Sequence, residues 1–118
     1  MNEEKVEKII KTLDDKKAED IKLIKIGDLT VVADYFIIAS GTSTTHVKAL
    51  SDEVDFQLKQ TLGISPVREE GYDTASWILL DYSDVIVHIF YPEAREFYSL
   101  ERLWQDGESV DISKIIEN

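Results

Sequence analysis

The sequence predicts an α/β (α+β) domain in which a mixed sheet of four or five strands is flanked by helices. Two segments, residues 3–17 and 44–62, repeat apolar residues with the 3.6-residue period of a helix. The segments around them are apolar at alternate positions or throughout, which is typical of strands. A chain of 118 residues is long enough for one domain with a single core. The order of these segments predicts the arrangement α-β-β-α-β-β-β-α.

Each predicted helix is identified by an apolar stripe. In the first helix the stripe occupies positions i, i+3, i+4 and i+7, namely Val6, Ile9, Ile10 and Leu13. The second helix follows a hydroxyl-rich turn whose side chains can cap its first N–H groups. It is expected to end at Gly63, because glycine readily adopts the left-handed conformation found just after a helix. Its stripe consists of Val47, Leu50, Val54 and Leu58.

Three predicted strands lie outside the best-defined hairpin. Residues 20–26 alternate between apolar side chains and lysine, so we expect a strand with one buried face. Residues 35–39 are apolar throughout, which predicts a central strand covered on both faces. Residues 66–69 are short and begin with proline, and a brief strand is expected there.

The best-defined element is a hairpin formed by residues 77–82 and 85–91, with only Ser83 and Asp84 between the two strands. A two-residue turn fixes the register, so residues whose numbers add up to 167 should face each other. One face of the hairpin is then almost wholly apolar and pairs Tyr82 with Val85, Leu80 with Val87 and Ile78 with Ile89. The other face pairs Asp81 with Ile86, Leu79 with His88 and Trp77 with Phe90. A face that mixes aromatic and charged side chains is typical of a surface that binds another protein.

The end of the chain is less regular. Pro92 should end the last strand of the hairpin, and residues 93–104 predict short helical turns. Leu100, Leu103 and Trp104 have helical spacing there. Residues 1–106 are therefore expected to form the single domain. Residues 107–118 are polar with isolated isoleucines, which predicts a tail that is loose or ordered by a partner.

Composition excludes several classes of function. The chain has 24 acidic and 13 basic residues and a net charge of −11, which disfavours direct nucleic-acid binding because phosphates would be repelled. A cationic partner is favoured instead, although many cytosolic proteins are acidic only for solubility. The chain has no cysteine, no apolar run of the ~18 residues that a membrane span needs, and no signal-peptide pattern at its start. We therefore expect a cytoplasmic protein without a membrane segment.

An enzymatic alternative depends on the turn Ser40-Gly41-Thr42-Ser43, at a predicted strand-to-helix junction. Backbone N–H groups at the start of a helix bind phosphate, and nucleotidyltransferases use a Gly-Ser turn in this way. Those enzymes also need two carboxylates that share a magnesium ion. Glu53 and Asp55 are the nearest candidates, but a spacing of two within a helix turns their side chains roughly 200° apart. The pattern favours a well-capped helix over a phosphate-handling site.

No metal or cofactor site is predicted. His46 and His88 are the only histidines, they lie on different elements, and no cysteine is available to join them. His88 is expected to be buried beside a carboxylate or, alternatively, to contact a partner. Phe56 lies roughly 180° from the apolar stripe of its helix, so either the C-terminal segment or a second chain should cover it.

Several motifs together resemble one known family. They are distributed over residues 6–106 and comprise Asp34-Tyr35-Phe36-Ile37-Ile38, Ser40-Gly41-Thr42-Ser43, Glu70-Gly71, Trp77, Leu80-Asp81-Tyr82, Asp84 to Phe90, and Arg95-Glu96-Phe97-Tyr98 followed by Leu100-Glu101-Arg102-Leu103-Trp104. In combination they are similar to the ribosomal silencing factor (Iojap) family. The resemblance implies a nucleotidyltransferase-like fold without the catalytic carboxylates, and a protein that is not an enzyme and needs no cofactor.

The resemblance also implies a function. It suggests a translational repressor that binds the large ribosomal subunit through large-subunit ribosomal protein fourteen and sterically blocks joining of the small subunit. A homodimer is implied when the protein is free. Trp77 and Tyr82 are the partner-binding positions that it implies most directly, and Asp81, Asp84, His88 and Arg95 match the pattern as further candidates. Trp77 remains open to a core role, because Phe90 is predicted opposite it. A general acidic homodimeric adaptor is a further alternative.

Overall fold

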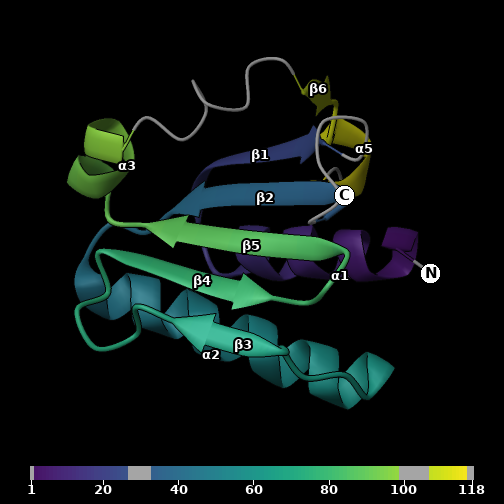
Figure 1. Ribbon diagram of the computed structural model, residues 1–118, viewed down its shortest axis with the longest axis horizontal. Helices are drawn as coiled ribbons and strands as arrows, with labels where there is room; N and C mark the ends of the chain where they lie inside the picture. Colours follow the sequence, from purple (N-terminus) through teal and green to yellow (C-terminus); the bar gives the residue numbers. More distant parts are fainter. Residues whose placement is uncertain (1, 27–32, 99–106, 117–118) are drawn as a thin grey trace.

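A six-stranded mixed sheet, with strand order β3-β4-β5-β2-β1-β6, forms the centre of the molecule (Figure 1). The computed structural model describes residues 2–26, 33–98 and 107–116. The helices are α1 (Asn2–Asp15), α2 (Thr44–Leu62), α3 (Pro92–Tyr98) and α5 (Ser113–Ile116). The strands are β1 (Glu19–Lys25), β2 (Tyr35–Ser40), β3 (Arg68–Glu70), β4 (Trp77–Asp81), β5 (Val85–Phe90) and β6 (Glu108–Val110). The predicted fold class is confirmed.

The centre of the sheet is its most deeply buried part. β2 and β5 are parallel neighbours, whereas the other adjacent strands pair antiparallel. Every residue of β5 is buried, as is every residue of β2 except Tyr35. The expectation that residues 35–39 form a central strand covered on both faces is therefore confirmed. The two edge strands, β3 and β6, are short and mostly exposed, which limits unwanted pairing with other chains.

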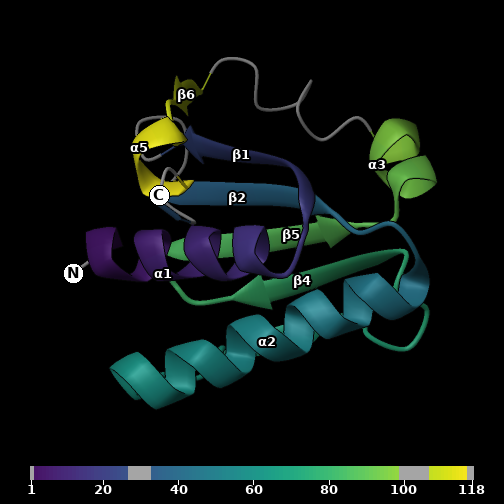
Figure 2. The ribbon, with the colours of Figure 1, turned by 180° about the vertical axis from the view of Figure 1, so that it is seen from behind.

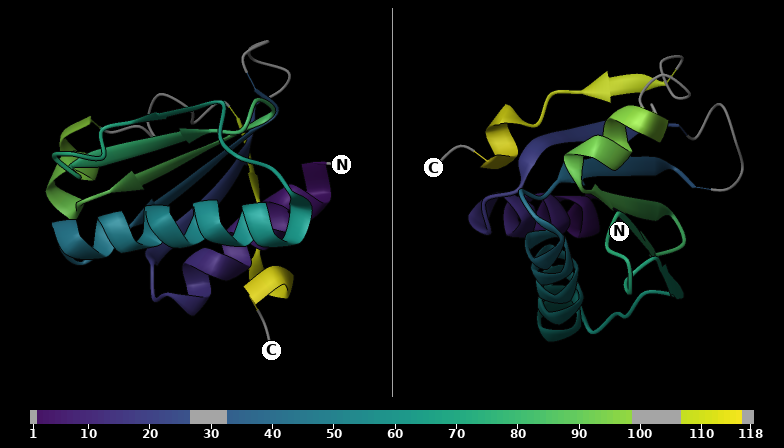
Figure 3. Two further views of the ribbon diagram at one scale, coloured as in Figure 1. Left: turned by 90° about the horizontal axis from the view of Figure 1, so that it is seen from below. Right: turned by 90° about the vertical axis from the view of Figure 1, so that its left-hand side faces the viewer.

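The two long helices cover the same face of the sheet (Figures 2 and 3). All four residues of the predicted apolar stripe of α1 are buried, and so are all four of the α2 stripe. Ser43 caps α2, because its Oγ accepts a hydrogen bond of 3.0 Å from the backbone N–H of His46. Gly63 ends α2 with φ +67°, which confirms the predicted C-cap. None of the helices described here is long and apolar enough to cross a membrane.

The two faces of the sheet have different compositions. The helix-side face packs aliphatic side chains of the strands, together with Tyr82, against α1 and α2: Leu23, Ile37, Ala39, Ile78, Leu80, Tyr82, Val85, Val87 and Ile89. The opposite face, which we call the Trp77 face, is richer in rings: Ile24, Phe36, Ile38, Trp77, Leu79, Ile86, His88 and Phe90. Because side chains alternate along a strand, each of these strands contributes to both faces.

The hairpin has the register that the two-residue turn predicts. Trp77 lies opposite Phe90, Leu79 opposite His88, and Asp81 opposite Ile86. The turn is closed by a 2.9 Å hydrogen bond from the backbone N–H of Tyr82 to the carbonyl of Val85. Ser83 has φ +75°, the left-handed backbone that such tight hairpin turns require.

The C-terminal segment differs from its prediction. Residues 108–110 form β6, which pairs antiparallel with β1 at the edge of the sheet. Helix α5 then packs against α1, and its isoleucines join the main core. The expectation of a loose tail is therefore wrong for residues 107–116, and β6 is the strand that raises the count to six. The predicted helical spacing of Leu100, Leu103 and Trp104 lies outside the described residues, whereas α3 provides the short helix expected after Pro92.

Candidate partner-binding surface

Trp77 is the main aromatic candidate on the Trp77 face. It lies at the start of β4, where its ring stacks on Phe90 with centroids 5.1 Å apart and an interplanar angle of 26°. Its indole Nε1–H donates a hydrogen bond of 3.0 Å to Nδ1 of His88. The side chain is partly exposed rather than fully buried. Trp77 is thus both packed and accessible, which agrees with neither a pure core role nor a free surface role.

His88 is a neighbour of Trp77, with ring centroids 5.8 Å apart, and is only 3% exposed. Its imidazole contacts the Phe36 ring at a centroid distance of 4.6 Å. Burial among these rings lowers the pKa of His88 from 6.5 to about 3, so the side chain is neutral at physiological pH. Since Nδ1 accepts the indole N–H, the imidazole proton resides on Nε2.

The carboxylate expected beside His88 is not its partner. Nδ1 of His88 accepts its hydrogen bond from the Trp77 indole, so the prediction of a carboxylate partner is wrong. Trp77 and His88 are diagonal neighbours across β4 and β5, because Leu79 lies opposite His88 and Trp77 is two residues before Leu79. Diagonal positions are within reach of long aromatic side chains. The predicted hairpin register therefore already placed Trp77 and His88 close enough to interact.

Tyr82 does not fit the contact role expected for it. It is 3% exposed and packs on the helix-side face, and its hydroxyl has no hydrogen-bond partner among the described residues. Burial raises the pKa of Tyr82 above its ordinary value, and the nearby carboxylates of Asp55 and Glu69 add to this rise. A partner on the surface cannot reach this ring without opening the core. We therefore leave Tyr82 out of the candidate surface.

Asp81 and Asp84 stabilise the hairpin turn. One Asp81 oxygen accepts a 2.8 Å hydrogen bond from the backbone N–H of Ser83, and the other lies 3.7 Å from Arg68. The Asp84 carboxylate forms a 2.6 Å ion pair with Lys5 of α1, whose ammonium also donates to the carbonyl of Tyr82. Lys5 was not anticipated, because no local pattern indicates a contact so distant in the sequence. Both carboxylates already have partners within the domain.

Arg95 has a structural position at the end of the sheet. Its guanidinium is buried and donates a 2.8 Å hydrogen bond to Oγ of Ser40, while a second nitrogen lies 3.5 Å from Asp20. These contacts attach α3 to the ends of β2 and β1. The geometry places Arg95 away from solvent, where it positions neighbouring elements.

Phe56 is exposed on α2, with 54% of its surface accessible. Within residues 107–116 the C-terminal segment packs against α1 and β1 rather than α2. The expectation that this segment covers Phe56 is therefore wrong for the described part of the chain. Coverage by a second chain remains the open alternative. Phe56 lies on α2, which covers the face of the sheet opposite the Trp77 face (Figure 3).

The turn Ser40-Gly41-Thr42-Ser43 uses its polar groups internally. The N–H of Gly41 donates to the carbonyl of Phe90, and the N–H of Thr42 donates to Nδ1 of His46. Nε2 of His46 in turn lies 2.8 Å from the carbonyl of Lys16 and links the turn to the end of α1. A Cβ at Gly41 would lie 2.9 Å from Val47, so close packing of α2 explains the glycine. These contacts favour a capped helix over a phosphate cradle.

The two carboxylates considered for a metal have different neighbours. Glu53 contacts Gln57 and Lys16, whereas Asp55 lies near Tyr82. The prediction from helical phase that they diverge is confirmed. Among the residues described, no group of three or more histidine, aspartate and glutamate side chains could hold a metal ion.

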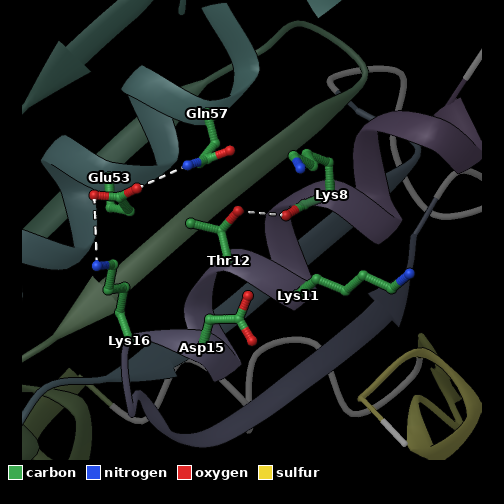
Figure 4. A pocket seen from close by; sticks show the side chains of 7 residues that line it. All are labelled: Lys8, Lys11, Thr12, Asp15, Lys16, Glu53 and Gln57. Carbon is green, nitrogen blue, oxygen red and sulfur yellow. Dashed lines mark hydrogen bonds and ion pairs between the residues drawn. The ribbon is translucent and has the colours of Figure 1, made fainter. Parts of the chain in front are cut away.

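A groove of about 330 Å³ lies between α1 and α2 (Figure 4). Its lining includes three lysines and two carboxylates, together with two uncharged polar side chains: Lys8, Lys11, Thr12, Asp15, Lys16, Glu53 and Gln57. Glu53 accepts a 2.9 Å hydrogen bond from the Gln57 amide and lies 3.9 Å from the Lys16 ammonium. Figure 4 shows both side chains pointing to Glu53, while Lys11 extends away from it. Because opposite charges line the same groove, its electrostatics do not single out one class of ligand.

Comparison with known proteins identifies the family. The family described as "Ribosomal silencing factor during starvation" matches residues 1–118. The chain is 40% identical over 113 residues to the ribosomal silencing factor of Bacillus subtilis, covering 95% of each chain. It is 36% identical over 115 residues to that of Halalkalibacterium halodurans, covering 98% of this chain and 97% of the other. A crystal structure of a Chromobacterium violaceum protein superposes with a TM-score of 0.84 at 35% identity, covering 92% of this chain and 89% of the other. The chain belongs to the ribosomal silencing factor family.

Proposed function

We propose that this protein represses translation by binding the large ribosomal subunit through large-subunit ribosomal protein fourteen and sterically blocking the small subunit. The relatives at 36% and 40% identity are named ribosomal silencing factors, which supports action on the ribosome. The structural observation that supports it best is Trp77, a partly exposed indole held in one orientation. Tryptophan on a rigid strand is typical of residues that dominate binding energy.

The mechanism requires no chemistry. A domain of this size, bound where the small subunit docks, excludes the small subunit by occupying its place. The net charge of −11 supports a basic ribosomal protein as the partner and opposes contact with rRNA phosphate. Specificity would then come from protein–protein contacts around the partly exposed side chain of Trp77. Such a protein acts in the cytoplasm, where ribosomal subunits join.

Subunit joining provides the test. Purified large subunits are incubated with excess protein before small subunits are added, and the mixture is separated by sucrose-gradient sedimentation. We expect a lower yield of joined ribosomes with the wild-type protein and recovery with Trp77→Ala. An unchanged yield with saturating wild-type protein would contradict the proposal.

A second experiment identifies the partner. Immobilised protein is incubated with lysate, and the retained proteins are compared with those retained by an unrelated protein of similar negative charge. Selective recovery of large-subunit proteins supports the proposal. Equal recovery of unrelated cationic proteins by both baits would favour a general acidic adaptor instead.

We also propose a homodimer for the free protein, with Phe56 at the interface. Phe56 is one of two large apolar residues that are strongly exposed among those described, the other being Val67. Two copies related by a two-fold axis would each bury the same residue. A dimer on α2 would leave the partly exposed Trp77, on the other side of the sheet, accessible to a ribosomal partner.

A further inference from the structure

We propose that His88 is a positioning residue: it does not touch the partner but fixes the orientation in which Trp77 is presented. This inference rests on the proposed function, since it concerns the same surface. It replaces the expectation that His88 itself contacts the partner, which its 3% exposure disfavours. The Trp77–His88 pair is here called the indole lock.

The indole lock restrains Trp77 from two directions. Stacking on Phe90 fixes the plane of the ring but permits the ring to flip or slide within that plane. The 3.0 Å hydrogen bond to His88 Nδ1 adds a direction, because the N–H is on one edge of the indole only. Together these contacts select one rotamer before the partner arrives. Ordering a side chain in advance lowers the entropic cost of binding.

The residue type at position 88 supports this role. His88 lies opposite Leu79 in the centre of an otherwise apolar strand, VIVHIF, where an aliphatic residue would pack without polar atoms. Burying the imidazole leaves Nε2 without a hydrogen-bond partner among the described residues, which costs free energy. An aliphatic residue could not accept the hydrogen bond from the Trp77 N–H. The hydrogen bond to Trp77 therefore explains why a histidine is buried here although its Nε2 finds no partner among the described residues.

The protonation state is suited to that task. An imidazolium would carry a proton on Nδ1 and could not accept the indole N–H. Burial lowers the pKa of His88 to about 3, so the acceptor persists at neutral pH. Among the described residues, the imidazole faces the rings of Phe36, Trp77 and Phe90, and the shift in its pKa comes from burial.

The test uses three variants at position 88 and one matched control. His88→Asn retains an acceptor near the position of Nδ1, His88→Leu removes it, and His88→Phe removes it while keeping a ring. Ile86→Val, two residues away on the same face of β5, trims a buried side chain without changing a polar group. The Trp77 indole N–H is observed by ¹⁵N NMR in the free proteins, with its signal assigned from Trp77→Phe. Binding to purified large subunits is measured on the same samples.

We expect the indole N–H to be protected from exchange in wild type, His88→Asn and Ile86→Val, and unprotected in His88→Leu and His88→Phe. Large-subunit binding should weaken roughly tenfold in His88→Leu and His88→Phe and at most twofold in the other variants. If His88→Leu does not fold, His88→Phe decides the question alone. Wild-type binding by a folded His88→Phe variant would overturn the inference.

The two proposals fail in different ways. If wild-type protein does not bind large subunits, the proposed function is wrong even when the indole N–H is protected. If Trp77→Ala abolishes binding but loss of protection in His88→Phe leaves binding intact, the surface is right and the positioning role of His88 is wrong.

Discussion

Trp77 and Tyr82 lie near opposite ends of the same strand, and both were expected to contact a partner. Their environments differ completely. Trp77 is partly exposed on the Trp77 face and donates its polar group to His88, whereas Tyr82 is buried against the helices with its hydroxyl unpaired among the described residues. The two residues are five positions apart in the chain, an odd number, which places their side chains on opposite faces of the sheet. Strand parity therefore decides which aromatic residue can serve binding and which serves stability.

The largest effect should come from truncating Tyr82. Tyr82→Ala would leave a cavity between β4 and the helices, and we expect a loss of about 3–5 kcal/mol in the free energy of unfolding. Chemical denaturation monitored by circular dichroism measures it. Tyr82→Phe is the matched control: it removes only a buried hydroxyl without a described partner, so stability should be unchanged or slightly higher. Normal stability with impaired ribosome binding in Tyr82→Ala would restore the contact role.

Acidification should destabilise the protein through His88, which lies on the Trp77 face. Its pKa in the folded protein, about 3, is below the ordinary 6.5, so between these values the unfolded chain binds the proton more readily. The free energy of unfolding should therefore fall as pH drops below 6.5, by up to about 1.4 kcal/mol per pH unit from this residue. Above pH 6.5 the contribution should be flat.

The control for acidification is the difference between wild type and His88→Leu, since the carboxylates titrate in both proteins. As the pH is lowered from 6.5 to 4.5, we expect the free energy of unfolding to fall more in the wild type than in His88→Leu. Parallel stability curves over this range would show that His88 is not buried as a neutral imidazole.

Substituting Phe56 should have a smaller effect, and only on the association of two copies of the protein. If a second copy covers the exposed half of this ring, Phe56→Ser should cost roughly 1 kcal/mol per protomer, or roughly thirtyfold in the dimer dissociation constant. Sedimentation equilibrium over a range of concentrations measures this change. Monomer stability should be nearly unaffected, because the side chain is exposed. An unchanged dissociation constant would exclude α2 from the dimer interface.

Much of the fold could be predicted because its elements have strong local patterns. The stripes of α1 and α2 follow helical periodicity, and the two-residue turn fixed the register of β4 and β5 before any long-range contact was known. β6 was missed for the opposite reason. A strand of three residues, Glu108–Val110, has too few positions to show alternation, and it forms because β1 offers an edge to pair with.

The site was predicted less well, because it depends on which side chains meet across strands. Trp77 was identified, but its hydrogen bond to His88 is a diagonal contact that requires both the register and the ring orientations. Asp84 pairs with Lys5, and Arg95 donates to Ser40. Both partners are distant in the sequence. Residue type indicated a polar contact in each case, while the identity of the partner came from the three-dimensional arrangement.

The most direct test of the central claim compares Trp77→Ala and Tyr82→Phe for binding to purified large ribosomal subunits, with folding measured on the same samples. If the Trp77 face binds the subunit, Trp77→Ala should weaken binding roughly thirtyfold, corresponding to about 2 kcal/mol, while remaining folded at the assay temperature. Tyr82→Phe should bind like wild type. Wild-type affinity in a folded Trp77→Ala protein would contradict the claim.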